Sequence, residues 1–200
     1  MSEHAHHEHD HDHDHDHDHA EVDEPENVEA EARRQLALAQ IRQWGDPALR
    51  MQAHEIEAID DDVRRLADRM FGLMEDAQGV GLAATQVGVL RRLFVFVDGD
   101  DGPRAIVNPR VVEQAEETEP DEEGCLSLQG VRVPVERSTR IVVEGTDLDD
   151  KPVRLELEGY TARVVQHELD HLDGVLIIDR TDDEHRRGAL RILRPRVVLR

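Results

Sequence analysis

Residues 166–174 read QHELDHLDG, and the interpretation of the whole chain starts from this stretch. If it is helical, His167 and His171 stand four residues apart and project from one face, at a spacing that can clamp a single metal ion. Glu168 lies beside them, where a carboxylate can carry a proton between water and a leaving group. Four apolar residues surround these groups and predict that part of the polar face turns inward: Val164, Val165, Leu169 and Leu172. The pattern favours a metallohydrolase helix over an ordinary solvated helix face.

A third metal ligand has to come from elsewhere, because an open tetrahedral site usually has three protein ligands. Cys125 is the candidate, since it is the only cysteine of the chain and stands in the stretch DEEGCLSLQG. Gly124 before it and Ser127 after it predict a bend with an accessible thiol. A buried cysteine that acts as a small hydrophobic residue is the alternative.

Residues 79–88 read GVGLAATQVG, a run whose close glycines let the backbone approach a ligand or a neighbouring strand. The run does not match the spacing of a phosphate-binding loop, and no lysine follows it. Gln86 is an amide in an otherwise apolar stretch. Its side chain can donate a hydrogen bond to a developing oxyanion, or it can bond to nearby backbone, and the sequence leaves both open.

The stretches GVGLAATQ, EGCLS and QHELDH, in this order, resemble the three signature motifs of the peptide deformylase family. The resemblance extends from about residue 40 to about residue 180. It implies that Glu168 is the general acid and base, and that Gln86 and the backbone N–H of Leu126 polarise a formyl oxygen. The metal ligands that it implies are Cys125, His167 and His171.

The same resemblance implies a reaction, a metal and a substrate. The reaction is removal of formate from the N-terminal formylmethionine of new polypeptides. The implied metal is Fe(II), although two imidazoles and a thiolate also suit Zn(II), Ni(II) or Co(II). The methionine side chain is expected in an apolar pocket near Val80, Leu126, Tyr160, Val164 and His167. The nascent backbone is expected to pair as an added strand along Val80, Gly81 and Leu82 and along the EGCLS segment. Arg163 stands where a pocket would want an apolar residue, so it is expected to point outward or to anchor the substrate.

Two other functions remain open from the sequence. A metallopeptidase of the HExxH type would want a third histidine or a carboxylate as ligand and would not use Cys125. A noncatalytic metal-buffering protein would depend on the N-terminal tail, because nine of the thirteen histidines lie between His4 and His19. Removing the tail separates the two classes, since an enzyme keeps its activity whereas a metal buffer loses its capacity.

The composition divides the chain into three parts. Residues 1–35 are interpreted as a disordered tail rich in His, Asp and Glu that could bind extra divalent metal. Residues 36–184 are the deformylase-like domain, and residues 185–200 are a basic segment with six arginines after position 185 that could contact the ribosome or pack as a helix with solvated arginines. The net charge of −22 is shared equally between residues 1–35 and the remainder. An acidic body argues against nonspecific nucleic-acid binding.

Neither a secretory signal nor a stretch long enough to span a membrane is expected in this sequence. With one cysteine and no possible intrachain disulfide, a cytoplasmic location fits best.

The expected fold class is α+β, a single domain in which short, mostly antiparallel strands surround a central metal-binding HExxH helix. Helices are expected over 28–43 and 60–75. Strands are expected over 93–97, 105–107, 111–114, 131–135, 140–144 and 153–157, and the acidic run 116–123 is expected to be a solvated loop.

Overall fold

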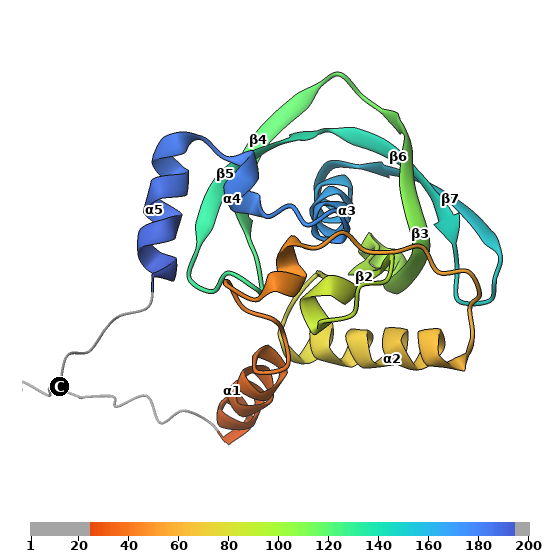
Figure 1. Ribbon diagram of the computed structural model, residues 1–200, viewed down its shortest axis with the longest axis horizontal. Helices are drawn as coiled ribbons and strands as arrows, with labels where there is room; N and C mark the ends of the chain where they lie inside the picture. The colour runs from red at the N-terminus through yellow and green to blue at the C-terminus, as the bar shows by residue number, and fades with distance from the viewer. Residues whose placement is uncertain (1–24, 195–200) are drawn as a thin grey trace, which may run out of the picture.

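The computed structural model describes residues 25–194 and has the α+β class that the sequence predicts (Figure 1). Its helices are α1 (Pro25–Leu38), α2 (Asp61–Asp76), α3 (Gly159–Leu172), α4 (Ile177–Arg180) and α5 (Asp183–Leu193), with short 3-10 turns η1 (Pro47–Arg50), η2 (Ala84–Val87) and η3 (Gly99–Asp101). Its strands are β1 (Gly81–Ala83), β2 (Leu93–Val97), β3 (Pro103–Gln114), β4 (Thr118–Gly124), β5 (Arg132–Ser138), β6 (Arg140–Thr146) and β7 (Pro152–Glu158).

All strand pairs are antiparallel within the described residues. Five strands form one sheet in the order β1-β2-β3-β6-β7, and β4 and β5 form a separate hairpin. Figure 1 shows α3 in the middle of the molecule, with the strands arching around it. The domain is therefore built as strands around one central helix, as predicted.

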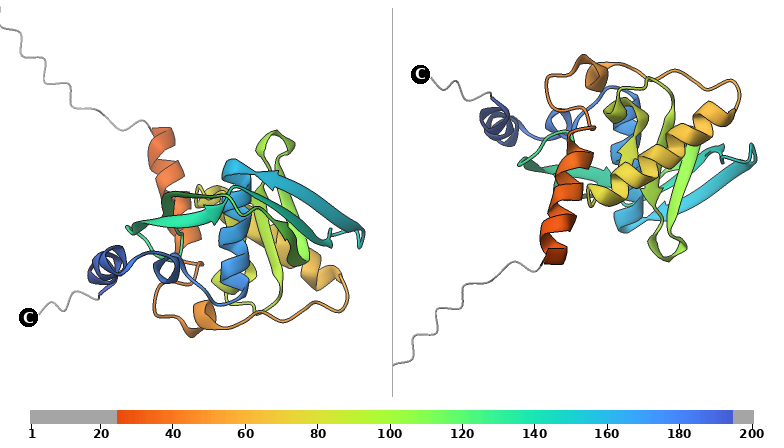
Figure 2. Two further views of the ribbon diagram at one scale, coloured as in Figure 1. Left: turned by 90° about the horizontal axis from the view of Figure 1, so that it is seen from above. Right: turned by 90° about the horizontal axis from the view of Figure 1, so that it is seen from below.

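Strand β2 explains why the sheet has a helix on each face. Its sequence LFVFV is apolar at every position, and residues that alternate along a strand point to opposite faces. Leu93 and Val95 pack in the cluster that contains α2, while Phe94 and Phe96 pack in the cluster that contains α3. The two views in Figure 2 show the sheet lying between these helices.

Helix α2 covers the face of the sheet away from α3. Asp60 caps it by accepting a hydrogen bond from the backbone N–H of Val63 at 2.9 Å, and two further acidic residues in the first turn complement the helix dipole. The residues that the helix buries lie on one apolar face: Val63, Ala67, Met70, Leu73 and Met74. The helix predicted over 60–75 is confirmed.

Helix α3 presents the QHELDH motif to the interior. It begins at Gly159, which has φ +55°, and the chain leaves it through Gly174, which has φ +72°. A side chain at Gly174 would come within 2.8 Å of the backbone of Arg50, so this turn needs glycine for both its conformation and its close approach. The helix start and stop place both motif histidines in the last two turns.

The structure corrects three sequence-based expectations about elements. The two strands expected over 105–107 and 111–114 form one strand, β3, which continues through register shifts. The acidic run 116–123 is not a loop, because most of it forms β4. Strand formers are scarce in TEPDEEG, so its pairing with β5 decides its conformation.

Helix α1 is the third correction. It occupies residues 25–38 rather than 28–43, so residues 25–35 are helical and do not belong to a disordered tail. Pro25 suits the first turn of a helix, where its missing N–H costs nothing. The helix ends early because the N–H of Arg42 donates to the carbonyl of Gln86, at 2.7 Å, instead of to its own helix. Residues 1–24 lie outside the described part of the chain.

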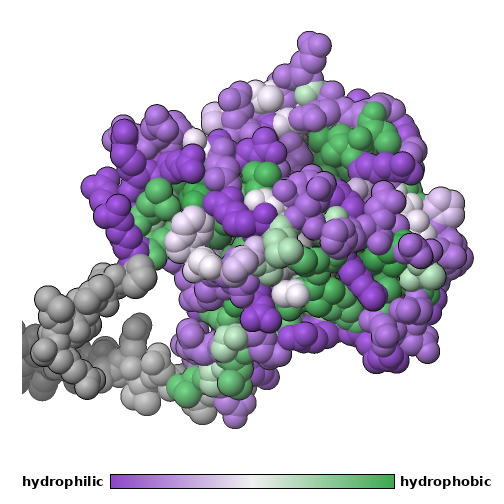
Figure 3. All heavy atoms as spheres, in the orientation of Figure 1, coloured by the Kyte–Doolittle hydropathy of each residue, from purple (hydrophilic) through white to green (hydrophobic). Residues whose placement is uncertain are grey.

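A third apolar cluster lies under the β4–β5 hairpin. It joins β5 to α4 and α5, and its largest buried members are Leu49, Leu128, Leu176 and Ile178. Helix α5 packs on this cluster through Ala189, so the part of the basic segment within α5, residues 185–193, forms a packed helix. None of the helices within residues 25–194 is long and apolar enough to cross a membrane. Hydrophilic residues dominate the face shown in Figure 3, with apolar side chains in several areas between them.

Candidate active site

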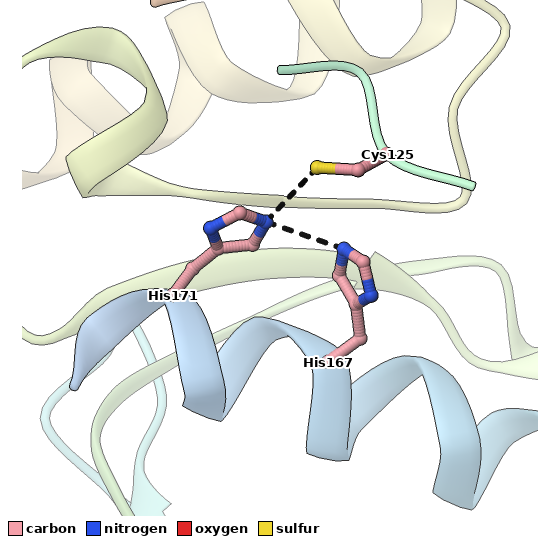
Figure 4. Close-up of side chains that lie close together, drawn as sticks. All are labelled: Cys125, His167 and His171. Atoms are coloured by element: carbon pink, nitrogen blue, oxygen red, sulfur yellow. Dashed lines mark hydrogen bonds between the residues drawn. The ribbon is translucent and has the colours of Figure 1, made fainter. Parts of the chain in front are cut away.

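Three side chains from two segments meet beside α3 (Figure 4). His167 and His171 project from the same face of the helix, and Cys125 reaches them from the loop that follows β4. The Nε2 atoms of the two histidines lie 3.2 Å apart, and Nε2 of His171 lies 3.2 Å from Sγ of Cys125. The structure thus brings together the three residues that the sequence predicts as ligands.

The geometry of this triad fits a single divalent metal ion. All three ligand atoms lie within 4.8 Å of one another, and two of their separations are 3.2 Å. Tetrahedral bonds to two imidazole nitrogens and a thiolate would separate the ligand atoms by roughly 3.3–3.6 Å. One thiolate and two imidazoles also form a donor set suited to Fe(II), Zn(II), Ni(II) or Co(II). Small adjustments of the side chains would therefore complete a metal site.

Glu123 decides which nitrogen of His167 is free to bind a metal ion. Oε2 of Glu123 lies 3.0 Å from Nδ1 of His167, and both oxygens also accept hydrogen bonds from the guanidinium of Arg137 at 2.9 Å. Burial opposes ionisation of Glu123, but Arg137 and His167 outweigh it and lower the pKa to about 2. A carboxylate only accepts hydrogen bonds, so Nδ1 carries the proton and Nε2 offers its lone pair.

The two histidines are held in different electrostatic surroundings. Burial lowers the pKa of His171 well below its ordinary value, and His167 and Arg137 lower it further, so His171 is neutral near pH 7. Burial also opposes the charged form of His167, but hydrogen bonding with Cys125 and Glu123 raises its pKa well above the ordinary value. A cation bound at Nε2 of His167 would take the place of this favoured proton.

A buried ionic network connects Glu123 to the end of the helix. Arg137 bridges Glu123 to Asp170, at 2.5 Å, and Asp170 accepts further hydrogen bonds from Arg180 at 2.6 and 3.1 Å. Charges removed from water need this degree of pairing to be tolerated. The network fixes α3 relative to the β4–β5 hairpin that leads to Cys125.

Arg163 belongs to the same network, which corrects the expectation that it points outward or anchors substrate. It is buried, and its guanidinium donates to Oε1 of Glu123 at 3.0 Å. It also donates to the carbonyls of Val135 at 2.8 Å and Glu119 at 2.6 Å. All three partners are on the β4–β5 hairpin, so Arg163 ties both strands to α3.

Glu168 lies next to His167 with an unpaired carboxylate oxygen. The residue is 3% exposed, and Oε2 has no hydrogen-bond partner among the described residues. Burial is the main cause that raises its pKa to about 7. Gly81 makes room for it, because a Cβ there would lie 2.8 Å from Cδ of Glu168 and closer still to Oε1. A carboxyl group that exchanges protons near neutrality is suited to acid and base catalysis.

Gln86 approaches the same site from the 3-10 turn η2. Its Oε1 accepts a hydrogen bond from the N–H of Ala83 at 2.8 Å, which fixes the orientation of the amide. Its Nε2 therefore points at Oγ of Ser127, 3.2 Å away, and lies 3.7 Å from Sγ of Cys125. The oxygen of Gln86 bonds to backbone, which is one of the two possibilities left open by the sequence, and its nitrogen faces the triad, so its role toward an oxyanion stays a prediction.

Five of the expected substrate-binding residues lie on two elements: three are on or next to β1, and two are on α3. Gly81 and Leu82 lie on β1, the first strand of the sheet. Among the described strands, β1 pairs only with β2. Val80 precedes them and has 41% of its surface exposed. Val164 is buried in the α3 cluster. Tyr160 is 64% exposed in the first turn of α3, so its ring lies at the surface rather than in an apolar pocket.

The sequence reasoning missed two polar groups of the site, Glu123 and Arg137. The signal available for Glu123 was its place two residues before Cys125, which puts it at the end of the strand that leads to this candidate ligand. It was hidden in a run of acidic residues that read as solvated. No local pattern marks Arg137, because its partners are 14 and 33 residues away.

Comparisons with known proteins match most of this chain to one family. The family model described as polypeptide deformylase matches residues 38–187. A peptide deformylase from Dictyoglomus thermophilum is 48% identical over 147 residues, which are 74% of this chain and 95% of that protein. The crystal structure of the Thermotoga maritima peptide deformylase is similar with a TM-score of 0.69 and 48% identity, over 71% of this chain and 96% of that one. A structure of the Synechococcus elongatus peptide deformylase with actinonin has a TM-score of 0.71 and 36% identity, over 78% of this chain and 91% of that one.

Proposed function

The chain belongs to the polypeptide deformylase family, hydrolases that remove the N-formyl group from nascent polypeptides, and from this premise we propose which of its residues carry out the reaction. The observation that carries the proposal is the buried carboxylate of Glu168, unpaired at Oε2, beside a triad of ligand atoms within 4.8 Å of one another. A structural helix face would not keep such a group without a partner.

Cys125, His167 and His171 hold the metal ion, and we propose Fe(II) as its identity, with Zn(II), Ni(II) and Co(II) as ions that the same donors accept. When bound, the metal supplies a Lewis acid that acidifies water and polarises the formyl carbonyl. Glu123 keeps Nε2 of His167 available through the hydrogen bond to Nδ1.

Glu168 moves the proton. As water attacks the formyl carbon, Oε2 of Glu168 accepts the proton that the water loses. The carboxylic acid then donates this proton to the departing amine nitrogen, so the products are formate and the free N-terminus. The raised pKa of about 7 lets the group act in both directions near neutral pH.

Gln86 and Leu126 stabilise the negative charge that develops on the formyl oxygen. Nε2 of Gln86 already faces the triad, at 3.7 Å from Sγ of Cys125, and Leu126 directly follows that cysteine. The second donor is the backbone N–H of Leu126. Removing one donor of this kind costs about 2.7–4 kcal/mol of transition-state stabilisation.

The nascent chain binds along the open edge of β1. Val80, Gly81 and Leu82 supply main-chain groups for an added strand, a mode that tolerates varied sequence. The exposed side chain of Val80 is placed to contact the substrate. Tyr160 and Val164 are weaker candidates for the methionine pocket, because one is at the surface and the other is in the core.

Metal stoichiometry tests the ligand assignment. Alanine variants of Cys125, His167 and His171, each made in a chain without residues 2–24 so that the tail histidines cannot bind metal, should fail to retain one ion per chain after dialysis. His185→Ala is the control, because His185 is exposed and pairs with Asp182, three residues before it, and not with any residue of the triad. Full stoichiometry in a triad variant would refute the assignment.

Turnover tests the oxyanion donors separately from the ligands. Gln86→Leu should lower formate release by about 100-fold or more while the metal content stays at the wild-type level. Loss of metal in this variant would show that Gln86 supports the metal site rather than the reaction. A peptidase of the HExxH type is the rival activity, and cleavage of internal peptide bonds by the wild-type protein would favour it.

We also propose that the N-terminal tail binds additional divalent metal, on the strength of its nine histidines between His4 and His19. Titration of the full chain and of the chain without residues 2–24 with Zn(II), both carrying Cys125→Ala, measures this capacity directly. The shortened chain should lose nearly all of it. Deformylase activity of the shortened wild-type chain should be unchanged, which would exclude a purely metal-buffering function.

We propose a cytoplasmic location and docking of α5 near the ribosomal exit tunnel. The helix buries Ala189 against the domain and leaves Arg186, Arg187 and Arg191 exposed, so packing and docking are compatible. Co-sedimentation with ribosomes at rising salt tests the docking. Glutamate at these three arginines should abolish co-sedimentation and leave turnover of a free formyl peptide intact.

A further inference from the structure

Residues 41–44, which follow α1, form a short strap that touches two of the motif segments at once. The backbone N–H of Arg42 donates to the carbonyl of Gln86 at 2.7 Å. The backbone N–H of Trp44 donates to the carbonyl of Ser127 at 2.9 Å, and Nε2 of Gln43 donates to the carbonyl of Leu126 at 3.1 Å. One stretch of four residues therefore holds the segment of each proposed oxyanion donor.

The strap is anchored at both ends. Ile41 is buried in the cluster of α1 and α2, and Trp44 packs on the cluster beneath the β4–β5 hairpin. The guanidinium of Arg50 lies 5.4 Å from the centroid of the Trp44 ring, and Arg50 also pairs with Asp179. Because its two ends are anchored in different clusters, the strap does not move with either motif segment alone.

The turn that contains the Leu126 N–H is held by one hydrogen bond within the turn and by two hydrogen bonds from the strap. Inside, the N–H of Leu128 donates to the carbonyl of Cys125 at 3.0 Å. That carbonyl belongs to the same planar, trans peptide as the N–H of Leu126, so the hydrogen bond directs this N–H to the opposite side, away from Leu128. Outside, Gln43 and Trp44 hold the next two carbonyls of the turn.

Gln43 is the one side chain of the strap that makes such a bond, and its amide is fully used. Its Nε2 donates to the carbonyls of Leu126 and Ile41, both at 3.1 Å, and its Oε1 accepts from Nε2 of Gln129 at 3.1 Å. The side chain is partly buried. Without the amide donor, the carbonyl of Leu126 would lose its partner and the peptide could rotate about the bonds of Leu126.

We infer that Gln43 is a positioning residue for the oxyanion site: its hydrogen bond to the carbonyl of Leu126, on the strap that also holds the backbone of Gln86, sets the separation and direction of the two donors. Gln43 touches neither substrate nor metal and acts through the backbone of Leu126, whose carbonyl and N–H belong to the two peptides on either side of its Cα. This inference rests on the proposed roles of Gln86 and Leu126.

Isosteric substitutions of Gln43 provide the test, in metal-loaded, full-length protein. Gln43→Glu keeps the length and the acceptor for Gln129 but replaces the donor to Leu126 by an oxygen. Gln43→Met keeps only the length and serves if the glutamate variant does not fold. Gln129→Ala is the matched control, because it removes the other contact of the Gln43 side chain and leaves the donor to Leu126 in place.

The expected result is a selective loss of turnover. Both Gln43 variants should lower kcat for formate release by about 10- to 100-fold with KM changed less than about 3-fold, since small displacements of catalytic groups have effects of this size. In Zn(II)-loaded protein labelled with ¹⁵N, the amide resonance of Leu126 should shift in both variants. Metal content should not change, and Gln129→Ala should match the wild type in every measurement.

Three outcomes overturn the inference. Wild-type kcat in a folded Gln43 variant, or an unshifted Leu126 resonance, would show that the hydrogen bond does not position the donor. A loss of kcat that follows a loss of metal would assign Gln43 to the stability of the Cys125 loop instead. Gln86→Leu, measured beside them, distinguishes the premises: if it has wild-type turnover, the proposed oxyanion site itself is wrong.

Discussion

Replacing Gly81 by alanine should move the carboxylate of Glu168 without changing any of the proposed metal ligands. Gly81 is buried on β1 and has a negative φ, so its backbone accepts alanine without strain. The added Cβ would lie 2.8 Å from Cδ and 3.0 Å from Cγ of Glu168, and closer still to Oε1. Carbon atoms in contact prefer separations of about 3.5–4.0 Å, so the side chain of Glu168 has to retreat by about 1 Å.

A displacement of this size at a catalytic group lowers the rate by about 100-fold. Overpacking in the core should lower the free energy of unfolding by only about 1–3 kcal/mol, so the variant should stay folded and keep its metal. The assay is formate release from a formyl-Met peptide, together with metal analysis and urea unfolding. Gly72→Ala on α2 is the control, because no heavy atom lies within 4 Å of its added Cβ.

The control should keep wild-type turnover and gain up to about 1 kcal/mol of stability from the better helix propensity of alanine. Gly81→Ala with wild-type turnover would refute the reasoning, because the carboxylate would then not need the position that the structure assigns to it. A loss of turnover that is matched by loss of metal would also refute it.

Glu123→Gln removes the anionic acceptor of the His167 ring and should weaken metal binding by about 10- to 100-fold in chelator competition; unchanged affinity would contradict the role of Glu123. Arg163→Met should lower the free energy of unfolding by about 3 kcal/mol in urea titrations, whereas Arg140→Met, which breaks only exposed ion pairs, should leave the midpoint unchanged; equal effects would mean that the buried network does not stabilise the hairpin. Asp179→Asn should destabilise the protein at neutral pH only. Burial opposes the charge of Asp179, but the hydrogen bond with Arg50 outweighs it and lowers the pKa, so this stability is present above the ordinary pKa and is lost as the pH falls through the lowered one. Thermal midpoints of variant and wild type should therefore converge in acid, and a constant difference would contradict this sign.

The candidate site could be predicted from the sequence because the proposed metal ligands and catalytic groups lie in three short, ordered motifs. The spacing of His167 and His171 predicts one helix face, and the glycine-bounded Cys125 predicts an accessible thiol. Both predictions are local in the chain. Strands such as β2 could be predicted for the same reason, since apolar residues at every position of a five-residue run indicate burial on both faces.

The rest depends on contacts between distant residues. Arg163 reads as a surface or pocket residue among apolar neighbours, yet its partners on the hairpin lie 28 to 44 residues earlier. Strand β4 reads as a solvated loop because its exposed acids conceal the one acid, Glu123, that faces inward. The buried carboxylate of Glu123 is tolerated because Arg137 and Arg163 form ion pairs with it. No local sequence pattern indicates these two arginines.

The most direct test of the account is formate release from a formyl-Met tripeptide by anaerobically prepared, Fe(II)-loaded protein, with Glu168→Ala measured beside it at equal metal content. The account predicts turnover by the wild type and its loss in the variant, because Glu168 is the group that moves the proton. Turnover that survives in Glu168→Ala, or none from the wild type with its metal bound, would contradict it.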